Sequence, residues 1–123
     1  MADDKPARAM FDWAVSVPPA DLAAWLMPAF RPDGPKGGND LRQSDLVEWL
    51  WRGYRPPTFP GATTVGKPIL EAVRLLEHAE LVHVSAPIAA DTVIKWSATR
   101  LGLATVADGT GAVRRRIKDR TGR

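Results

Sequence analysis

Two cations, two hydroxyls and one indole ring share one side of a helix that we expect over residues 91–101. The side chains are Thr92, Lys95, Trp96, Thr99 and Arg100. Lysine and arginine can bond phosphates or guanine edges, threonine can bond phosphate, and tryptophan can stack on a base or pack on sugar. The alternative for this face is an ordinary solvated helix side, with Trp96 packed against a neighbouring element.

A second basic cluster follows toward the C-terminus. Residues 103–107 and 112–117 are expected to form two strands, because the Asp108-Gly109 pair between them is typical of a β-hairpin turn. Strand alternation separates neighbouring arginines onto opposite faces, so one set of them must be exposed. The hairpin therefore predicts a phosphate-clamping wing, whose cations are Arg114, Arg115, Arg116, Lys118 and Arg120.

The net charge is distributed unevenly along the chain. Residues 91–123 hold eight lysines or arginines against three aspartates, a net of +5, whereas the whole chain has a net charge of +3. Residues 1–40 sum to −2 and residues 41–90 to zero. This asymmetry predicts a polyanionic partner for the last third of the chain.

Hydrophobic periodicity predicts the elements that position these residues. Helices are expected over residues 41–54 and 68–79, where the apolar residues recur on one face and Pro68 suits a first helical turn. Residues 81–84 alternate as a short strand. The last helix is expected to begin after Asp91 as its N-cap and to end at Gly102.

We expect one domain with a mainly α fold, a small antiparallel β-hairpin and flanking segments, a winged-helix-like α+β arrangement. The predicted boundaries are a flexible tail (1–10), an N-terminal hydrophobic arm with a short helix (11–30), a loop (31–40), the main domain (41–117) and a basic C-terminal tail (118–123). The arm is expected to pack on the main domain or on a second copy of the chain.

Trp49 lies outside the apolar face of the helix expected over residues 41–54. Basic residues flank it on the sequence, Arg52 among them. An outward tryptophan beside an arginine resembles a binding hot spot, although burial within the same chain explains it as well. Trp49 and Arg52, together with residues 11–30, are therefore candidates for binding a protein partner or a second copy.

Several motifs that could serve catalysis or hold a cofactor lack essential parts. Residues 61–67 match the first seven positions of a P-loop, but Pro68 replaces the hydroxyl residue that would bind magnesium. The two histidines, His78 and His83, do not make up a metal site of three or more defined ligands. No serine has the surroundings of an esterase nucleophile. We expect no enzymatic activity, no catalytic or metal site and no cofactor.

The composition limits the class of protein further. The chain has no cysteine, which excludes disulfides and thiolate sites. No apolar run is long enough to cross a bilayer, and the N-terminus lacks the pattern of a secretory signal. We expect a cytoplasmic protein that does not associate with membranes.

Residues 69–117 resemble the helix, strand, short link, recognition helix and wing of winged helix-turn-helix regulators. The match runs from Thr92-Val93 through Arg100-Leu101-Gly102-Leu103 to the Asp108-Gly109 turn and the arginine-rich return strand, and it is similar to the recognition segment of MarR-like transcription factors. It departs from that pattern at residues 85–90, which leave about one turn for the preceding helix. The resemblance implies that a DNA groove is entered by Lys95, Trp96, Thr99 and Arg100, and that residues 114–116 contact the backbone.

Two hypotheses follow from the sequence. The first is a small transcriptional regulator that binds nucleic acid, double-stranded DNA rather than RNA. The second is a protein-interaction module, such as an adaptor, inhibitor or assembly factor, on a winged-helix-like scaffold.

Overall fold

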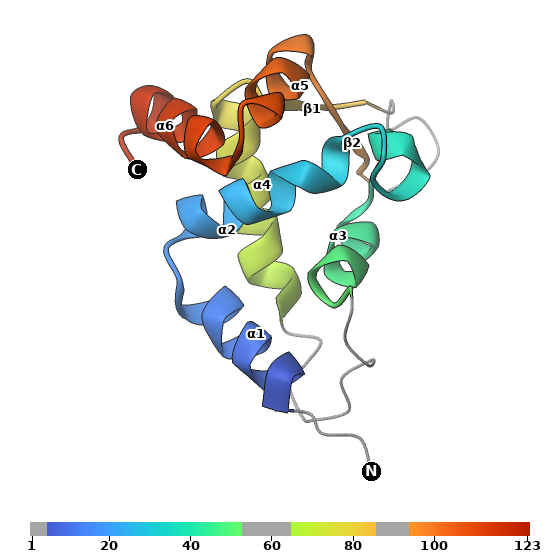
Figure 1. Ribbon diagram of the computed structural model, residues 1–123, viewed down its shortest axis with the longest axis vertical. Coiled ribbons are helices and arrows are strands. Elements are labelled where there is room, and N and C mark those ends of the chain that lie inside the picture. Colours follow the sequence, from blue (N-terminus) through green and yellow to red (C-terminus); the bar gives the residue numbers. More distant parts are fainter. Residues whose placement is uncertain (1–4, 53–64, 86–93) are drawn as a thin grey trace.

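The computed structural model describes residues 5–52, 65–85 and 94–123, and the side chains from residue 8 onward (Figure 1). Its helices are α1 (Lys5–Ser16), α2 (Pro19–Leu26), α3 (Gln43–Leu50), α4 (Gly66–His78), α5 (Arg100–Ala107) and α6 (Thr110–Thr121). Two short 3-10 helices, η1 (Met27–Phe30) and η2 (Pro35–Gly38), follow α2. The strands are β1 (Val82–Val84) and β2 (Trp96–Ala98). A mainly α fold with a small antiparallel sheet is thus confirmed.

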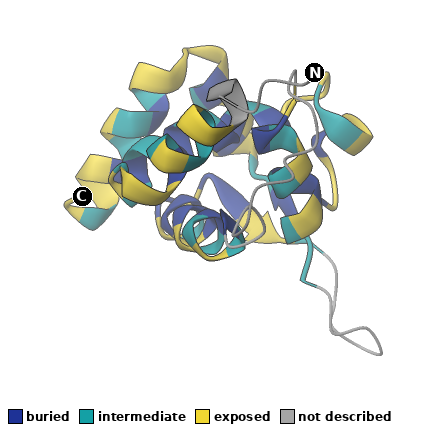
Figure 2. Ribbon diagram, turned by 90° about the horizontal axis from the view of Figure 1, so that it is seen from below, coloured by how far each residue is buried: buried dark blue, intermediate teal, exposed yellow. Residues whose placement is uncertain are grey.

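Helices α2 and α4 form the centre of the molecule, where α2 crosses α4 (Figure 1). Both helices are rich in small or aliphatic residues on the sides that meet, and Leu22, Leu26, Ile69 and Leu76 are fully buried. Helices α3 and α6 pack against this pair from different sides. Figure 2 shows the resulting pattern, in which the buried segments line the interior and the exposed ones cover the outer helix faces.

The two strands pair antiparallel, with Val82 opposite Ala98 and Val84 opposite Trp96. The backbone of Trp96 points to the other edge of β2, where its amide and carbonyl both bond Leu41 at 2.8 Å. Leu41 lies directly before α3, so this bridge ties the start of α3 to the sheet. The order across the sheet is therefore Leu41, β2, β1.

The strongest periodic signals in the sequence are confirmed. Helix α4 covers the expected helix over residues 68–79 almost completely, and Pro68 lies in its first turn. Strand β1 falls within the expected residues 81–84. Helix α4 ends at a left-handed Glu80 (φ 64°), and the Leu81 amide then donates to the Leu76 carbonyl at 2.9 Å.

The helix expected over residues 91–101 is wrong. Residues 96–98 are strand β2, and the helix that follows starts only at Arg100. Residues 96–98 pair with β1, and the backbone groups of Trp96 bond Leu41 on the other edge. These pairings, which are far apart in the sequence, select the strand. The expected N-cap Asp91 lies outside the described residues; Thr99 caps α5 instead.

The wing expected over residues 103–117 is also wrong, because both of its strands are helical. Asp108-Gly109 connects α5 to α6, and Gly109 has the positive φ (98°) that such a turn needs. The same dipeptide suits a β-hairpin and a tight helix-to-helix turn, so it does not identify its flanks. Only Val113 and Ile117 of α6 are buried, a spacing of four residues that belongs to a helix and not to a strand.

Gly102, expected to end a helix, instead lies inside α5 where the helix touches the sheet. A Cβ placed on it would come within 1.9 Å of the Leu81 carbonyl oxygen. The absence of a side chain at position 102 therefore lets α5 approach the backbone beside β1.

The N-terminal segment differs from the expected tail and arm. Residues 5–10 belong to α1, where a tail was expected through residue 10. Residues 19–30 contribute a large part of the core and pack within the chain, since Leu22, Leu26, Met27 and Phe30 are all buried.

Candidate nucleic-acid interface

Two of the residues expected to contact nucleic acid have structural roles instead. Trp96 is 3% exposed, and its indole Nε1 donates to Glu77 Oε1 at 2.7 Å. The Thr99 hydroxyl accepts from the Gly102 amide at 2.9 Å and donates to the Glu80 carbonyl at 2.6 Å. Both side chains are thus engaged in holding β2 and α5, and Thr92 lies outside the described residues.

Three of the expected wing arginines are paired with carboxylates of the body. Arg114 Nε contacts Asp21 Oδ1 on α2 at 2.5 Å. Arg116 donates to the Ala79 carbonyl at 3.1 Å and lies 3.7 Å from Glu80 Oε1, which also binds Arg120. These arginines attach α6 to α2 and to the end of α4.

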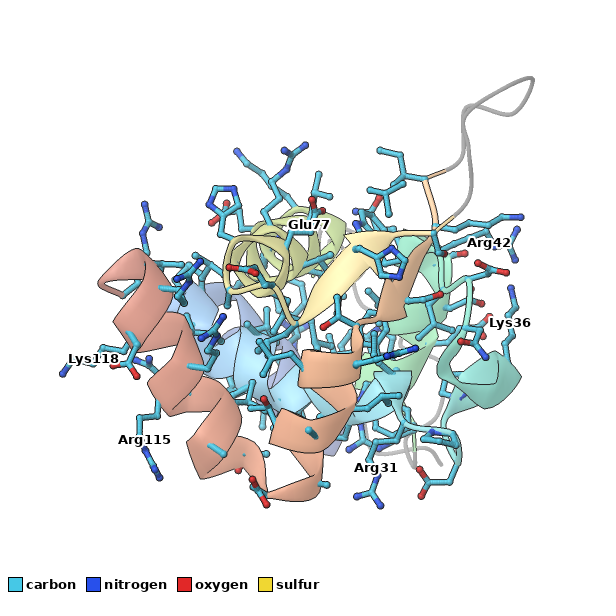
Figure 3. All side chains as sticks on the ribbon, turned by 90° about the horizontal axis from the view of Figure 1, so that it is seen from above. Arg31, Lys36, Arg42, Glu77, Arg115 and Lys118 are labelled. Atoms are coloured by element: carbon cyan, nitrogen blue, oxygen red, sulfur yellow. The ribbon has the colours of Figure 1, made fainter. Side chains whose placement is uncertain are left out.

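The other expected cations are scattered over separate elements. Lys95 precedes β2, Arg100 begins α5, and Arg115 and Lys118 lie on α6. None of the four forms an ion pair with any described residue. Figure 3 shows Arg115 and Lys118 projecting from the outer side of α6, at the opposite end of the molecule from Lys36 and Arg42.

Helix α4 presents a different set of polar residues to solvent. Lys67, Glu71, Arg74 and His78 are all exposed, and their spacing puts them on one side of the helix. Within the described part of the chain, neither Lys67 nor Arg74 has an acidic partner. The opposite side of α4, which includes Ile69 and Val73, is buried in the core. This packing fixes the orientation of the helix, so the stripe faces solvent.

A cleft lies on each side of the exposed stripe of α4, and Arg74 borders both. The first, of about 410 Å³, separates α4 from the start of α3 and from β2; it is lined by Arg42, Gln43, Ser44, Leu70, Arg74, Ile94 and Trp96. The second, of about 400 Å³, separates α4 from the start of α2 and the end of α6; it is lined by Pro19, Glu71, Arg74, Leu75, His78, Arg120, Thr121 and Arg123. The first cleft thus adds Arg42 to Arg74, and the second adds Arg120 and Arg123. Of these, Arg42 pairs with Asp45 and Arg120 with Glu80.

The start of α3 holds its own charge cluster around Asp45. The buried Asp45 carboxylate accepts from the Arg42 amide at 2.8 Å and from Lys36 Nζ at 3.0 Å. Burial disfavours the charged form, but the hydrogen bonds from Arg42 and Lys36 outweigh it, so the pKa of Asp45 lies below its ordinary value. Asp45 therefore stays charged and fixes the position of Arg42 beside the first cleft.

The expected partner-binding residues, Trp49 and Arg52, lie in a cluster of tryptophan rings around the Arg52 guanidinium. The Arg52 guanidinium is 3.7 Å from the centroid of the Trp49 ring and 4.2 Å from that of Trp25. Trp25 in turn contacts Trp13 of α1, with ring centroids 5.9 Å apart. This cluster joins α1, α2 and the end of α3, and so gives Trp49 and Arg52 neighbours within the chain.

The described residues place no three His, Asp or Glu side chains close enough to share a metal ion. His78 and His83 are both exposed, on α4 and β1. Residues 61–64 of the incomplete P-loop lie outside the described residues. None of the helices in the described part of the chain combines the length and apolar character that a bilayer crossing requires.

The exposed residues of α4 were missed because only the apolar face of this helix was considered. Their signal was present in the sequence, since Lys67, Arg74 and His78 recur at helical spacing opposite the buried face. What the sequence could not show is that Asp21 and Glu80 form ion pairs with the arginines of α6, while no ion pair to Arg74 forms among the described residues. Comparisons with models of protein families, with curated proteins and with solved structures found no match to this chain.

Proposed function

We propose that this chain is a winged-helix-like nucleic-acid-binding domain that presents α4, rather than residues 91–101, to double-stranded DNA. The observation that carries the proposal is Arg74, an exposed arginine without an acidic partner among the described residues, between one cleft that also contains Arg42 and another that also contains Arg120 and Arg123. A regulatory role in transcription is the corresponding biological proposal.

The order of the elements supports this choice of helix. Three helices (α2, α3 and α4) are followed by an antiparallel strand pair, and Leu41 joins the sheet from between the first two helices. In helix-turn-helix proteins the second helix of the pair enters the major groove while the first crosses the backbone. In this chain α3 and α4 take those places. Residues 86–93, which join the two strands as a wing does in winged helices, lie outside the described residues.

The chemistry of the α3 start suits the flanking backbone contact. Ser44 is exposed at the first turn of α3 and borders the same cleft as Arg42 and Arg74. A serine hydroxyl, a guanidinium and the amides of a helix start all donate to phosphate oxygens. If α4 lies in the major groove of a DNA duplex, one strand of that duplex would therefore meet donors from the start of α3.

Helix geometry favours DNA over RNA as the duplex. The major groove of B-form DNA is about 12 Å wide and admits an α-helix. The major groove of A-form RNA is deep and too narrow for side chains to read. A protein that binds through the α4 stripe is therefore expected to prefer duplex DNA to duplex RNA of the same sequence.

The test compares two double variants with the same change in net charge. K67E/R74E alters α4, whereas R100E/K118E alters two exposed cations of the C-terminal helices. Fluorescence anisotropy with a short labelled DNA duplex should show at least about a tenfold weaker affinity for K67E/R74E, equivalent to about 1.4 kcal/mol. The control variant should lose much less.

Salt dependence provides an independent measurement in the same assay. The affinity of the unaltered protein should fall steeply with salt, and the slope of log K against log[salt] should be smaller for K67E/R74E, because fewer counterions are released. Circular dichroism checks that both variants are folded. Equal losses in the two variants, or no DNA binding by the unaltered protein at low salt, would exclude α4 as the binding helix.

A further inference from the structure

Helix α5 leaves most of its apolar residues uncovered. Only Arg100 and Thr105 carry polar side chains in this helix, yet only Gly102 and Val106 are buried. Leu101 and Leu103 are each 40% exposed, and the exposed Ala104 and Ala107 belong to the same helix. A helix that is apolar nearly all round is usually covered on more than one side.

A groove of about 320 Å³ lies between α5 and α6 on this uncovered side. Its lining combines apolar and charged side chains: Leu101, Ala104, Thr105, Asp108, Ala112, Arg115, Arg116 and Asp119. Arg116 is paired with Glu80. Within the described part of the chain, Arg115, Asp108 and Asp119 have no ion pair.

The mixture of unpaired charges selects the occupant of this groove. A nucleic acid or an acidic protein would satisfy Arg115 but would be repelled by Asp108 and Asp119, and a basic partner would meet the opposite conflict. A second copy of the same surface, turned by a two-fold axis, brings Arg115 of each chain toward the acids of the other. Such an interface is self-complementary, as two-fold dimers require.

We propose that the chain forms a homodimer through the groove face of α5 and α6, with Leu101 and Ala104 in its apolar part and Arg115 paired with Asp108 or Asp119 of the other copy. Four helices, two from each chain, meet at this interface. The inference is independent of the proposed function, because the α4 stripe contributes nothing to it.

The first experiment measures the mass of the protein in solution over a range of concentrations by sedimentation velocity or light scattering. The unaltered chain should be dimeric, and L101Q should raise the dimer dissociation constant at least about tenfold. The matched control is V15Q, a loss of an equally exposed valine on α1 (44% exposed), which should leave the dimer intact. K67E/R74E should remain dimeric as well.

The second experiment tests the charge complementarity directly. R115D alone and D108R/D119R alone should each be mainly monomeric, because like charges then meet across the two-fold axis. A mixture of the two variants should form a heterodimer, because every cross-pair then joins opposite charges. Circular dichroism establishes that each variant is folded.

Three results would overturn the proposal. They are an unaltered chain that remains monomeric up to millimolar concentration, a dimer that L101Q does not weaken, and a mixture of the charge variants that stays monomeric. In the first case the α5 face would belong to a different partner, and in the second the chain would associate through another surface.

Discussion

Helices α4 and α6 both carry several basic side chains, but the two helices use them differently. On α6, Arg114, Arg116 and Arg120 are paired with carboxylates of α2 and of the end of α4. On α4, Lys67 and Arg74 have no acidic partner in the described part of the chain. A count of charges along the sequence therefore does not show which of the cations already have an acidic partner in the fold.

The difference follows from how each helix is anchored. Helix α4 has a broad apolar side with five buried residues, so its attachment to the core does not depend on its exposed cations. Helix α6 buries only Val113 and Ile117, and its arginines supply the remaining attachments to the body. Cations that anchor a helix are not available to a ligand, whereas those on a helix anchored by packing are.

The largest expected effect tests whether the position of α6 depends only on its own arginines or also on the close contact between α5 and the backbone of Leu81. Gly102→Ala would place a Cβ within 1.9 Å of the Leu81 carbonyl, so α5 would have to move away from β1. We expect a loss of about 2–4 kcal/mol in the free energy of unfolding, measured by urea denaturation. Gly111→Ala, which has no atoms near its added Cβ, is the matched control. A stability equal to that of the control would show that α5 is not seated against Leu81.

A smaller effect is expected at Asp45, the acid that holds Lys36 and Arg42 beside α3. Because the folded-state pKa of Asp45 is lowered, its contribution is present above the ordinary carboxyl pKa of about 4 and is lost as the pH falls through the lower folded value. Asp45→Asn should cost about 1–2 kcal/mol at pH 7 and flatten the loss of stability in acid. Denaturation at a series of pH values measures both effects. An unchanged acid dependence in Asp45→Asn would contradict this assignment.

The smallest effect sharpens the comparison between α4 and α6. Arg116→Met keeps the side-chain stem but removes the hydrogen bond to the Ala79 carbonyl and the pairing with Glu80. Stability should fall by about 1 kcal/mol, while the affinity for a DNA duplex should change little. Thermal unfolding and anisotropy measure the two quantities. A large loss of affinity without a loss of stability would instead assign Arg116 to the binding surface.

The parts of the fold that could be predicted from sequence are those with long, strictly periodic patterns. Helix α4 has an uninterrupted apolar face after Pro68, and β1 is a short run rich in β-branched residues; both were confirmed. The prediction for residues 94–99 was wrong because their pattern fits a helix and a strand equally well. Their secondary structure depends on backbone bonds to Leu41 and Leu81, which lie far away in the sequence. The Asp108-Gly109 turn failed for a related reason, since it fixes a chain reversal but not the structure on either side.

The proposed DNA-binding surface was harder to predict than the fold. Its residues come from α4, the start of α3 and the end of α6, which meet only after the chain has folded. Trp96, the most suggestive side chain in the sequence, is used for packing and for a bond to Glu77. An aromatic residue beside cations is therefore weak evidence of a binding face unless its exposure is known.

Three separate attachments of the last two helices converge on the two residues that follow α4. The Thr99 hydroxyl bonds the carbonyl of Glu80, Arg116 bonds the carbonyl of Ala79, and Arg116 and Arg120 share the Glu80 carboxylate. Tilting α4 while the C-terminal helices stay in place would break all of these bonds together. The two residues after α4 thus link α4 to both C-terminal helices. A change in the angle of α4 would strain these bonds unless α5 and α6 moved with it.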